Sequence, residues 1–199
     1  MRLGVFGGSF NPPHIGHVLV AVDACEALGL DKLIVIPASA NPLKGSASIG
    51  ASPVQRLEMT RCAFGADPRF EVSAMEIDRG GLSYTVDTLE ALAAENEGAE
   101  LILLLGMDAL ATFDRWVRPE RIRKLCRIVV LARGNGADER APGVGSGLEL
   151  PGNVTVVTTR RVDVSSSEIR QRVADGKSIT GFVAESVERI ISAAKLYTV

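Results

Sequence analysis

A chain of 199 residues has the length of about one domain. Hydrophobic residues make up 46% of it, enough for one buried core, and 22 basic against 24 acidic residues give a net charge of −2. This balance gives no reason to expect a nucleic acid or an anionic membrane as a partner. The cysteines Cys25, Cys62 and Cys126 form no C-x-x-C pair, and we find neither a signal peptide nor a membrane-spanning run. We therefore expect one cytoplasmic domain, residues 1–199.

Short runs of Val, Ile and Leu alternate along the chain with segments of helical character. In chain order, the runs that predict buried strands are Leu3–Phe6, Leu33–Pro37, Phe70–Met75, Leu101–Leu105, Ile128–Leu131 and Val154–Val157. The segments that predict helices are Ile15–Leu28, Pro53–Phe64, Tyr84–Glu95, Ala109–Phe113, Pro119–Leu125, Ser166–Ala174 and Val183–Ala194. Apolar strands that alternate with helices form parallel sheets covered on both faces. We therefore expect an α/β, doubly wound, mostly parallel sheet.

Two stretches rich in Gly, Pro and polar residues interrupt this pattern. The first, Ala38–Ser52, is long enough to have a function of its own. The second, Gly134–Gly152, contains almost no apolar periodicity, and we expect it to be a mobile surface loop.

The first motif with chemical meaning follows the first predicted strand and runs from Gly7 to His17. Its order is a strand, a Gly-Gly turn, a Pro-Pro pair and the start of a helix. The glycines allow the backbone to approach an anion, and the free N–H groups and positive dipole end of the helix attract one. His14 and His17, the only histidines of the chain, lie one turn apart on one face. We interpret the motif as a nucleotide phosphate site.

Other interpretations of the two histidines remain open. Each could be a helix cap or a packed ring, or the pair could bind a metal ion. With no acidic or cysteine ligand nearby, they make a poor zinc site. Two histidines in one turn beside Gly-Gly favour phosphate.

A second motif, Val164–Arg170, follows the last predicted strand. Ser165 can cap the next helix while Glu168 reaches back to complete a capping box, and Arg170 lies one turn after Ser166. By itself, Ser-Ser-x-Glu is a common helix start, and Arg170 could be a solvated charge. Because the carboxyl ends of parallel strands share one edge of a sheet, we instead expect a second anion site that faces the first.

In this order and spacing, the two motifs resemble those of the nicotinate-mononucleotide adenylyltransferases, in the H-x-G-H nucleotidyltransferase superfamily, over nearly the whole chain. Gly80–Thr88 resembles the segment that holds the nicotinate ring, Gly106–Leu110 the stretch beside the nucleotide, and Arg115–Trp116 the aromatic wall. The resemblance implies a Rossmann-like fold. It also implies transfer of AMP from ATP to nicotinate mononucleotide, which gives deamido-NAD and pyrophosphate in NAD biosynthesis.

The resemblance further implies roles for individual residues. The expected catalytic residues are His14, His17 and Arg170. The expected ATP-binding residues are Gly7, Gly8, Ser9, Phe10, Gly106, Asp108, Ser165 and Ser166. The expected mononucleotide-binding residues are Lys44, Ser83, Tyr84, Thr85, Trp116 and Arg133. No dedicated metal ligand is expected, because Mg²⁺ would arrive on ATP with most of its ligands from phosphate and water.

The acceptor would be recognised by its carboxylate and its ring. A carboxylate is an anion, so it should lie at the helix start near Tyr84, with Trp116 stacked on the pyridine ring. Packing alone is an alternative interpretation of both aromatic residues. We interpret Asp23 and Asp87 as helix-surface charges rather than catalytic groups.

Three positions depart from the family pattern. Asn11 stands where Asp is commoner, Leu43 stands before Lys44 without the usual histidine, and Val117 stands where tyrosine is common.

Other functions remain possible on the sequence alone. Another adenylyltransferase of the superfamily would use nicotinamide mononucleotide or phosphopantetheine as its acceptor. A fragment of a class I aminoacyl-tRNA synthetase would need a Lys-Met-Ser-Lys-Ser segment, which the chain lacks. A catalytically silent nucleotide-binding regulator is the last alternative, and the intact histidine and arginine motifs argue against it.

Overall fold

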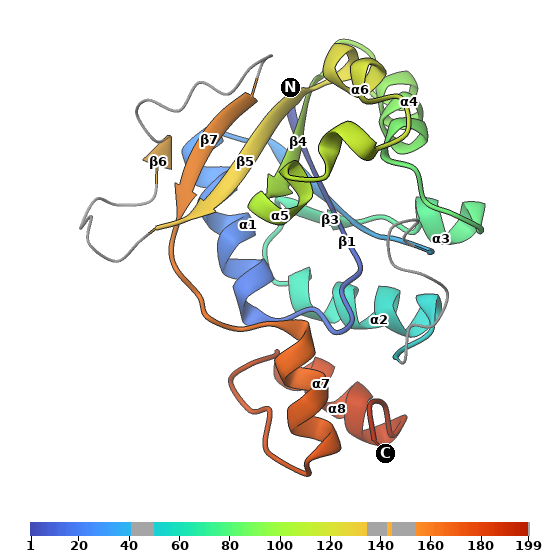
Figure 1. Cartoon of the computed structure of the whole chain (residues 1–199), viewed down its shortest axis with the longest axis vertical. Coiled ribbons are helices and arrows are strands. Elements are labelled where there is room, and N and C mark those ends of the chain that lie inside the picture. The colour runs from blue at the N-terminus through green and yellow to red at the C-terminus, as the bar shows by residue number, and fades with distance from the viewer. Residues whose placement is uncertain (41–49, 135–142, 145–153, 199) are drawn as a thin grey trace.

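The computed structural model describes residues 1–40, 50–134, 143–144 and 154–198 (Figure 1). The strands are β1 Arg2–Gly8, β2 Lys32–Pro37, β3 Phe70–Val72, β4 Glu100–Gly106, β5 Arg127–Arg133, β6 Gly143–Val144 and β7 Val154–Thr159. The helices are α1 Ile15–Leu28, α2 Pro53–Phe64, α3 Met75–Arg79, α4 Thr85–Glu95, α5 Met107–Leu110, the 3₁₀ turn η1 Phe113–Arg115, α6 Pro119–Leu125, α7 Ser166–Ala174 and α8 Glu185–Ala193. Within the described residues, no helix combines the length and the apolar character needed to cross a membrane.

The described strands form one seven-stranded sheet in the order β3-β2-β1-β4-β5-β7-β6. Every pairing is parallel except that of β6 with β7. The prediction of a mostly parallel, doubly wound sheet is therefore confirmed. The chain moves outward from β1 to β3 and then returns to place β4 on the other side of β1. Such a reversal of strand order leaves a crevice at the carboxyl ends of the strands, where ligands bind.

Two hydrophobic cores lie on opposite faces of this sheet. On one face, α1 and α2 pack onto the strands through side chains such as Ala24 and Phe64. On the other face, α4 and α6 pack through Leu89 and Ile122. The alternation of buried strands and helices in the sequence thus produces the expected layers.

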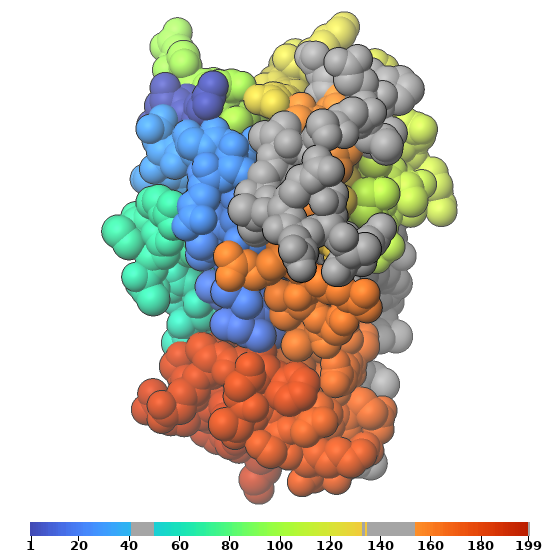
Figure 2. All heavy atoms as spheres, turned by 90° about the vertical axis from the view of Figure 1, so that its left-hand side faces the viewer, coloured from blue at the N-terminus to red at the C-terminus, as the bar shows by residue number. Residues whose placement is uncertain are grey.

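A third hydrophobic cluster lies away from the sheet. α7 and α8 follow β7 and pack against α2, so that Ile169, Val187 and Ile191 join Met59 in one cluster. Figure 2 shows these two helices, orange to red, gathered at one end of the molecule. Tyr197 belongs to the same cluster, which brings the last described residues close to α2.

Four helices, α1, α2, α6 and α7, have the predicted bounds because their ends carry local signals. Gly29 ends α1 in the left-handed conformation at φ 58°, and Pro53 and Pro119 occupy the first turns of α2 and α6. Ser165 Oγ accepts the N–H of Glu168 at 3.1 Å and caps α7. The reciprocal bond from the Glu168 side chain is absent from the hydrogen bonds of the described residues, so only the serine half of the predicted capping box forms.

The predicted strand Phe70–Met75 is too long. β3 ends at Val72, and α3, which was not predicted, begins at Met75. The side chain of Ser73 explains the change, because its Oγ accepts the N–H of Met75 at 3.3 Å and turns the chain into the helix.

The predicted helix Ala109–Phe113 is also wrong, since this region divides into α5 and η1. Thr112 Oγ1 donates to the Ala109 carbonyl at 3.1 Å, between the two short elements. Near the end of the chain, α8 begins at Glu185 rather than at the predicted Val183.

A short strand was missed within the predicted loop Gly134–Gly152. Gly143 and Val144 form β6 at the edge of the sheet, antiparallel to β7. The remaining positions of this loop, 135–142 and 145–152, lie outside the described residues, as do residues 41–49 of the loop predicted at Ala38–Ser52.

Asp23 is not a surface charge, contrary to the prediction. The residue is 1% exposed, and its carboxylate accepts the backbone N–H of Arg160 at 2.8 Å and the Arg160 Nε–H at 2.9 Å. The contact joins α1 to the segment that follows β7. Asp87, in contrast, is partly exposed and pairs with Arg118, as predicted for a surface charge.

Candidate active site

An aromatic side chain anchors the turn after β1. Phe10 is 2% exposed, and its φ of 45° lies in the left-handed region that residues other than glycine rarely adopt. Its ring makes edge contacts with the rings of Phe6, His17 and Phe64, with centroids 5.1 to 5.8 Å apart. The burial of Phe10 thereby fixes the path of the turn that leads into α1.

The two histidines come together at the start of α1. His14 is the N-cap residue, and its N–H donates to His17 Nδ1 at 3.2 Å. The two rings are stacked, with centroids 3.7 Å apart. Because His17 Nδ1 accepts a hydrogen bond, the neutral His17 ring carries its proton on Nε2, where it is a donor suited to a phosphate oxygen. The capping interpretation and the phosphate interpretation are therefore compatible.

The second motif lies directly against the first. Ser166 Oγ donates to the Pro12 carbonyl at 2.8 Å, and Arg170 Nη1 donates to the Asn11 carbonyl at 2.8 Å. Arg170 Nη2 also donates to Ser167 Oγ at 3.1 Å. The structure thus brings the two motifs together, as expected, and the donors of α7 hold the backbone of the turn.

The turn has further contacts that the sequence analysis missed. Asn11 Oδ1 accepts the hydroxyl of Tyr197 at 2.7 Å and the N–H of Ala51 at 3.2 Å. Arg56 Nη1 donates to the Ser9 carbonyl at 2.8 Å. An asparagine keeps the side-chain oxygen that the commoner aspartate would offer, which explains how this departure preserves the contact. No local spacing signals these partners. For Arg56, the one available hint was its place among the apolar positions of the predicted helix Pro53–Phe64.

A cavity of about 240 Å³ opens at the carboxyl ends of β1, β2 and β4. This is the position expected for a ligand in such a sheet. Of the expected catalytic and binding residues, those that line it are Gly7, Gly8, Ser83, Tyr84, Thr85, Gly106 and Trp116. Because Gly7 and Gly8 also lead into the histidine turn, the cavity and the turn are adjacent.

Trp116 forms part of the cavity wall. Its ring is tilted against that of Phe113, with centroids 5.3 Å apart, and its Nε1 donates to Thr112 Oγ1 at 3.4 Å. Val117, which is 44% exposed, lines the cavity beside it. One edge of the indole is therefore fixed by packing, while the residue remains accessible from the cavity.

The start of α4 faces the same cavity. Tyr84 is the N-cap residue in an extended conformation, and no side chain caps the helix. Ser83 Oγ accepts the N–H of Ser39 at 2.9 Å, and the Ser83 N–H donates to the Ala40 carbonyl at 2.9 Å. These bonds join the segment before α4 to the segment after β2. The N–H groups of the first turn of α4 make this end of the cavity suitable for an anion.

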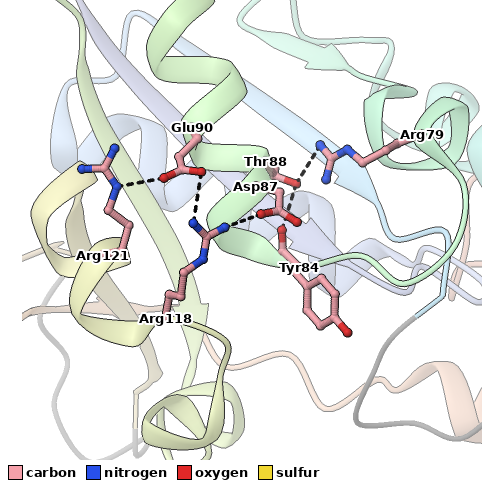
Figure 3. A network of polar contacts seen from close by, with 7 residues as sticks. All are labelled: Arg79, Tyr84, Asp87, Thr88, Glu90, Arg118 and Arg121. Atoms are coloured by element: carbon pink, nitrogen blue, oxygen red, sulfur yellow. Dashed lines mark hydrogen bonds and ion pairs between the residues drawn. The ribbon is translucent and has the colours of Figure 1, made fainter.

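Glu76 and Thr88 also line the cavity, and neither was among the predicted site residues. Glu76 is 8% exposed and accepts the Thr88 hydroxyl at 2.7 Å, while Arg79 Nη2 lies 3.5 Å from the same hydroxyl oxygen. Figure 3 shows Thr88 between Arg79 and the Tyr84 carbonyl. Glu76 was missed because α3, which carries it, was not predicted.

Exposed ion pairs join α4 to α6 (Figure 3). Arg118 pairs with Asp87 and Glu90, and Arg121 donates to Glu90 at 2.8 Å. The hydrogen bond from Arg121 lowers the pKa of the Glu90 carboxyl. Exposed pairs of this kind contribute little to stability, so the core between the helices remains the main contact.

Three predicted site residues are placed neither at the cavity nor in the two motifs that meet at the turn after β1. Asp108 lies exposed on α5 and does not line the cavity. Lys44 lies outside the described residues. Arg133 is the last residue of β5 and pairs in register with Thr159, but its side chain is not among the described parts of the structure.

Comparison with known proteins gives concordant results. The chain matches the model of the cytidylyltransferase-like family over residues 5–172. A relative from Gemmatimonas aurantiaca, named a probable nicotinate-nucleotide adenylyltransferase, is 48% identical over 99% of this chain and 92% of its own length. A relative of the same name from Thermus thermophilus is 39% identical over 99% of this chain and 100% of its own length.

A solved structure shares the fold. The nicotinic acid mononucleotide adenylyltransferase of Plasmodium falciparum, complexed with NaAD, superposes with a TM-score of 0.75 over 98% of this chain and 97% of its own. The two sequences are 16% identical, so the likeness concerns the fold alone.

Proposed function

The chain belongs to the nicotinate-nucleotide adenylyltransferases of the cytidylyltransferase-like family, and from this premise we propose that it transfers AMP from ATP to nicotinate mononucleotide. A phosphate oxygen of the mononucleotide attacks the α-phosphorus of ATP. The new P–O bond completes deamido-NAD, and the bond to the β-phosphate breaks and releases pyrophosphate. This step belongs to NAD biosynthesis.

One observation supports the proposal above all others. The turn with His14 and His17 is in direct contact with α7 through Ser166, and it continues through Gly8 into an aromatic-walled cavity. Donors suited to phosphate thus stand next to a cavity suited to a flat ring. Adenylyl transfer to a pyridine mononucleotide needs these two features side by side.

The reaction needs no nucleophile from the protein, since the substrate supplies the attacking oxygen. Catalysis then depends on positioning and on stabilisation of charge on the transferring oxygens. In this proposal His14, His17 and Arg170 contact the reacting phosphates. The remaining expected ATP ligands are Gly7, Gly8, Ser9, Phe10, Gly106, Asp108, Ser165 and Ser166.

The acceptor would occupy the cavity. Its carboxylate would accept from the N–H groups at the start of α4, near Tyr84 and Thr85, and its ring would stack on Trp116. Ser83 supports this segment, and Lys44 and Arg133 remain proposed ligands of the mononucleotide.

A divalent ion such as Mg²⁺ would enter with ATP. The chemistry of the turn fits this, because imidazole, N–H and guanidinium donors suit phosphate oxygens better than a bare cation. Among the described residues, no group of three His, Cys, Asp or Glu side chains is arranged to hold a metal ion. In this proposal the phosphates and water provide most of the ligands, and the ion neutralises phosphate charge.

We also propose that residues 1–199 form one domain that works in the cytoplasm without a nucleic acid or membrane partner. The near-neutral net charge of −2 supports the last point.

Turnover of the purified chain tests the proposed reaction. Pyrophosphate release is measured with ATP and, in turn, nicotinate mononucleotide, nicotinamide mononucleotide and phosphopantetheine, with CTP replacing ATP as a control. The amide carries an NH₂ donor that would stay unpaired at the start of α4, at a cost of about 1–3 kcal/mol. We therefore expect kcat/KM to favour the acid by about 5- to 150-fold.

The outcomes separate the alternatives. Equal values, or a preference for the amide or for phosphopantetheine, would overturn the acceptor and leave adenylyl transfer standing. Faster turnover with CTP would overturn the choice of ATP. Absence of pyrophosphate with every pair of substrates would favour a silent regulator.

A further inference from the structure

A buried arginine connects the two sides of the candidate active site. Arg56 of α2 is 6% exposed, and both of its terminal nitrogens donate to backbone carbonyls. Nη1 lies 2.8 Å from the Ser9 carbonyl oxygen, and Nη2 lies 2.8 Å from the Ser39 carbonyl oxygen. A single guanidinium thus bonds two chain segments that are 30 residues apart in the sequence.

Each segment belongs to a different part of the site. Ser9 lies in the turn between β1 and α1 that leads to the histidines. Ser39 follows β2, and its N–H donates at 2.9 Å to Oγ of Ser83, which lines the cavity next to the start of α4. We call the segment between β1 and α1, Ser9–His14, the phosphate turn. A continuous series of hydrogen bonds therefore runs from the phosphate turn through Arg56 to the cavity wall.

The environment of Arg56 is unusual for a buried charge. Among the described residues its side chain forms no ion pair, and its guanidinium donates to the two backbone carbonyls. Burial lowers the pKa of the guanidinium below its ordinary value. A buried cation without a carboxylate is costly, whereas the planar fork of arginine can reach two acceptors at fixed positions. A lysine would keep the charge but lose the fork.

We propose that Arg56 is a positioning residue. It holds the phosphate turn and the acceptor cavity at a fixed position relative to each other, so that the acceptor phosphate lies in line with the α-phosphorus of ATP. The inference rests on the proposed adenylyl transfer. Each side has other supports: Ser166 and Arg170 hold the turn, and Ala40 holds Ser83. Loss of Arg56 should therefore leave each half able to bind its substrate while the two halves lose their alignment.

The test compares the variants Arg56→Lys and Arg160→Lys with the unaltered chain. Arg160→Lys is the matched control. It also removes a guanidinium that makes more than one hydrogen bond, here to the Asp23 carboxylate, but Arg160 lies outside the proposed site. A misplacement of about 1 Å can cost about 100-fold in rate, so we expect kcat of Arg56→Lys to fall by about 100-fold. Calorimetric Kd values for ATP alone and for nicotinate mononucleotide alone should change by less than about threefold. Arg160→Lys should lower the melting temperature and keep kcat.

A second variant, Ser83→Ala, breaks the last hydrogen bond of the series, because it removes the acceptor of the Ser39 N–H. We expect kcat to fall in this variant as well. Because both changes break the same series, the double variant Arg56→Lys/Ser83→Ala should lose little more kcat than Arg56→Lys alone. If Arg56→Lys does not fold, Ser83→Ala alone decides: a rise in KM with unchanged kcat would overturn the proposal.

Failure of the proposal and failure of the proposed function can be told apart. If the unaltered chain makes no dinucleotide, the proposed function fails. If it does, a normal kcat in Arg56→Lys, an equal loss in Arg160→Lys, or fully additive losses in the double variant would refute the positioning role alone.

Discussion

His17 serves the fold and the proposed chemistry with different nitrogens. Nδ1 accepts the N–H of His14 at 3.2 Å and so helps to begin α1. The proton of the neutral ring is then on Nε2, which would donate in the proposed contact with ATP. The two contributions can be separated by substitution.

We predict that His17→Ala lowers kcat by about 100- to 1,000-fold, because it removes one donor to a developing anion. The free energy of unfolding should fall by only about 1 kcal/mol, the usual worth of a helix cap. Steady-state kinetics and urea unfolding measure the two effects.

His17→Asn is the matched variant. An asparagine oxygen can replace Nδ1 as the acceptor, but nothing replaces Nε2. Stability should therefore recover while kcat stays low. Near-normal turnover in this variant would remove His17 from the chemistry.

Asp23 gives a prediction about stability. Its carboxylate is fully buried, but the paired Arg160 side chain is 44% exposed, so the pair is worth less than a fully buried one. We expect Asp23→Asn to reduce the free energy of unfolding by about 2 kcal/mol, measured by urea denaturation. Asp87→Asn breaks an exposed pair and should cost at most about 1 kcal/mol. Equal losses in the two variants would contradict this ranking.

At the scale of elements, the C-terminal helices connect a distant cluster to the phosphate turn. α7 and α8 pack on α2 away from the sheet, yet Ser166, Arg170 and Tyr197 all bond to the turn after β1. Burial raises the pKa of the Tyr197 phenol, which keeps its hydroxyl protonated as a donor to Asn11 at neutral pH.

Tyr197→Phe should retain the packing and lose this hydrogen bond. We expect a loss of about 1 kcal/mol in stability and, since the turn becomes less fixed, about a fivefold fall in kcat/KM for ATP. Thr198→Ala removes a hydroxyl from the same terminal turn, and within the described residues this hydroxyl donates to the Lys195 carbonyl. Kinetics with varied ATP should show no change in that control, and a loss of the same size there would rule out a specific role for Tyr197.

At the scale of the whole molecule, the two cores on either side of the sheet each bury a thiol. Burial raises the pKa of Cys25 from 9.0 to about 11 and that of Cys126 from 9.0 to about 12. In the unfolded chain both thiols ionise near their ordinary pKa. Above that pH the folded chain therefore holds more protons than the unfolded chain.

The sign of the pH effect follows. The free energy of unfolding should be unaffected by these thiols below pH 9 and should fall as pH rises from 9 toward 11 and 12. The slope is at most about 1.4 kcal/mol per pH unit for each thiol. Urea unfolding under reducing conditions measures it, and Cys25→Ala/Cys126→Ala should show a flatter dependence. Parallel curves for the two proteins would contradict the prediction.

Local signals in the sequence determined much of this protein. Apolar runs predicted the parallel strands, and Gly29, Pro53, Pro119 and Ser165 fixed helix ends, because the conformational preferences behind them act within a few residues. The histidine and Ser-Arg motifs were found for the same reason, since each lies within one turn of a helix.

Only the tertiary structure decided which side chains hold these motifs together. Arg56 and Tyr197 contact residues 47 and 186 positions away, and Asp23 is buried by Arg160, 137 positions away. β6 likewise exists only because β7 offers it a partner. A hydrogen bond between distant segments leaves no periodic pattern in the sequence. The packing of the sheet and helices creates it, and with it the alignment on which the proposed reaction depends.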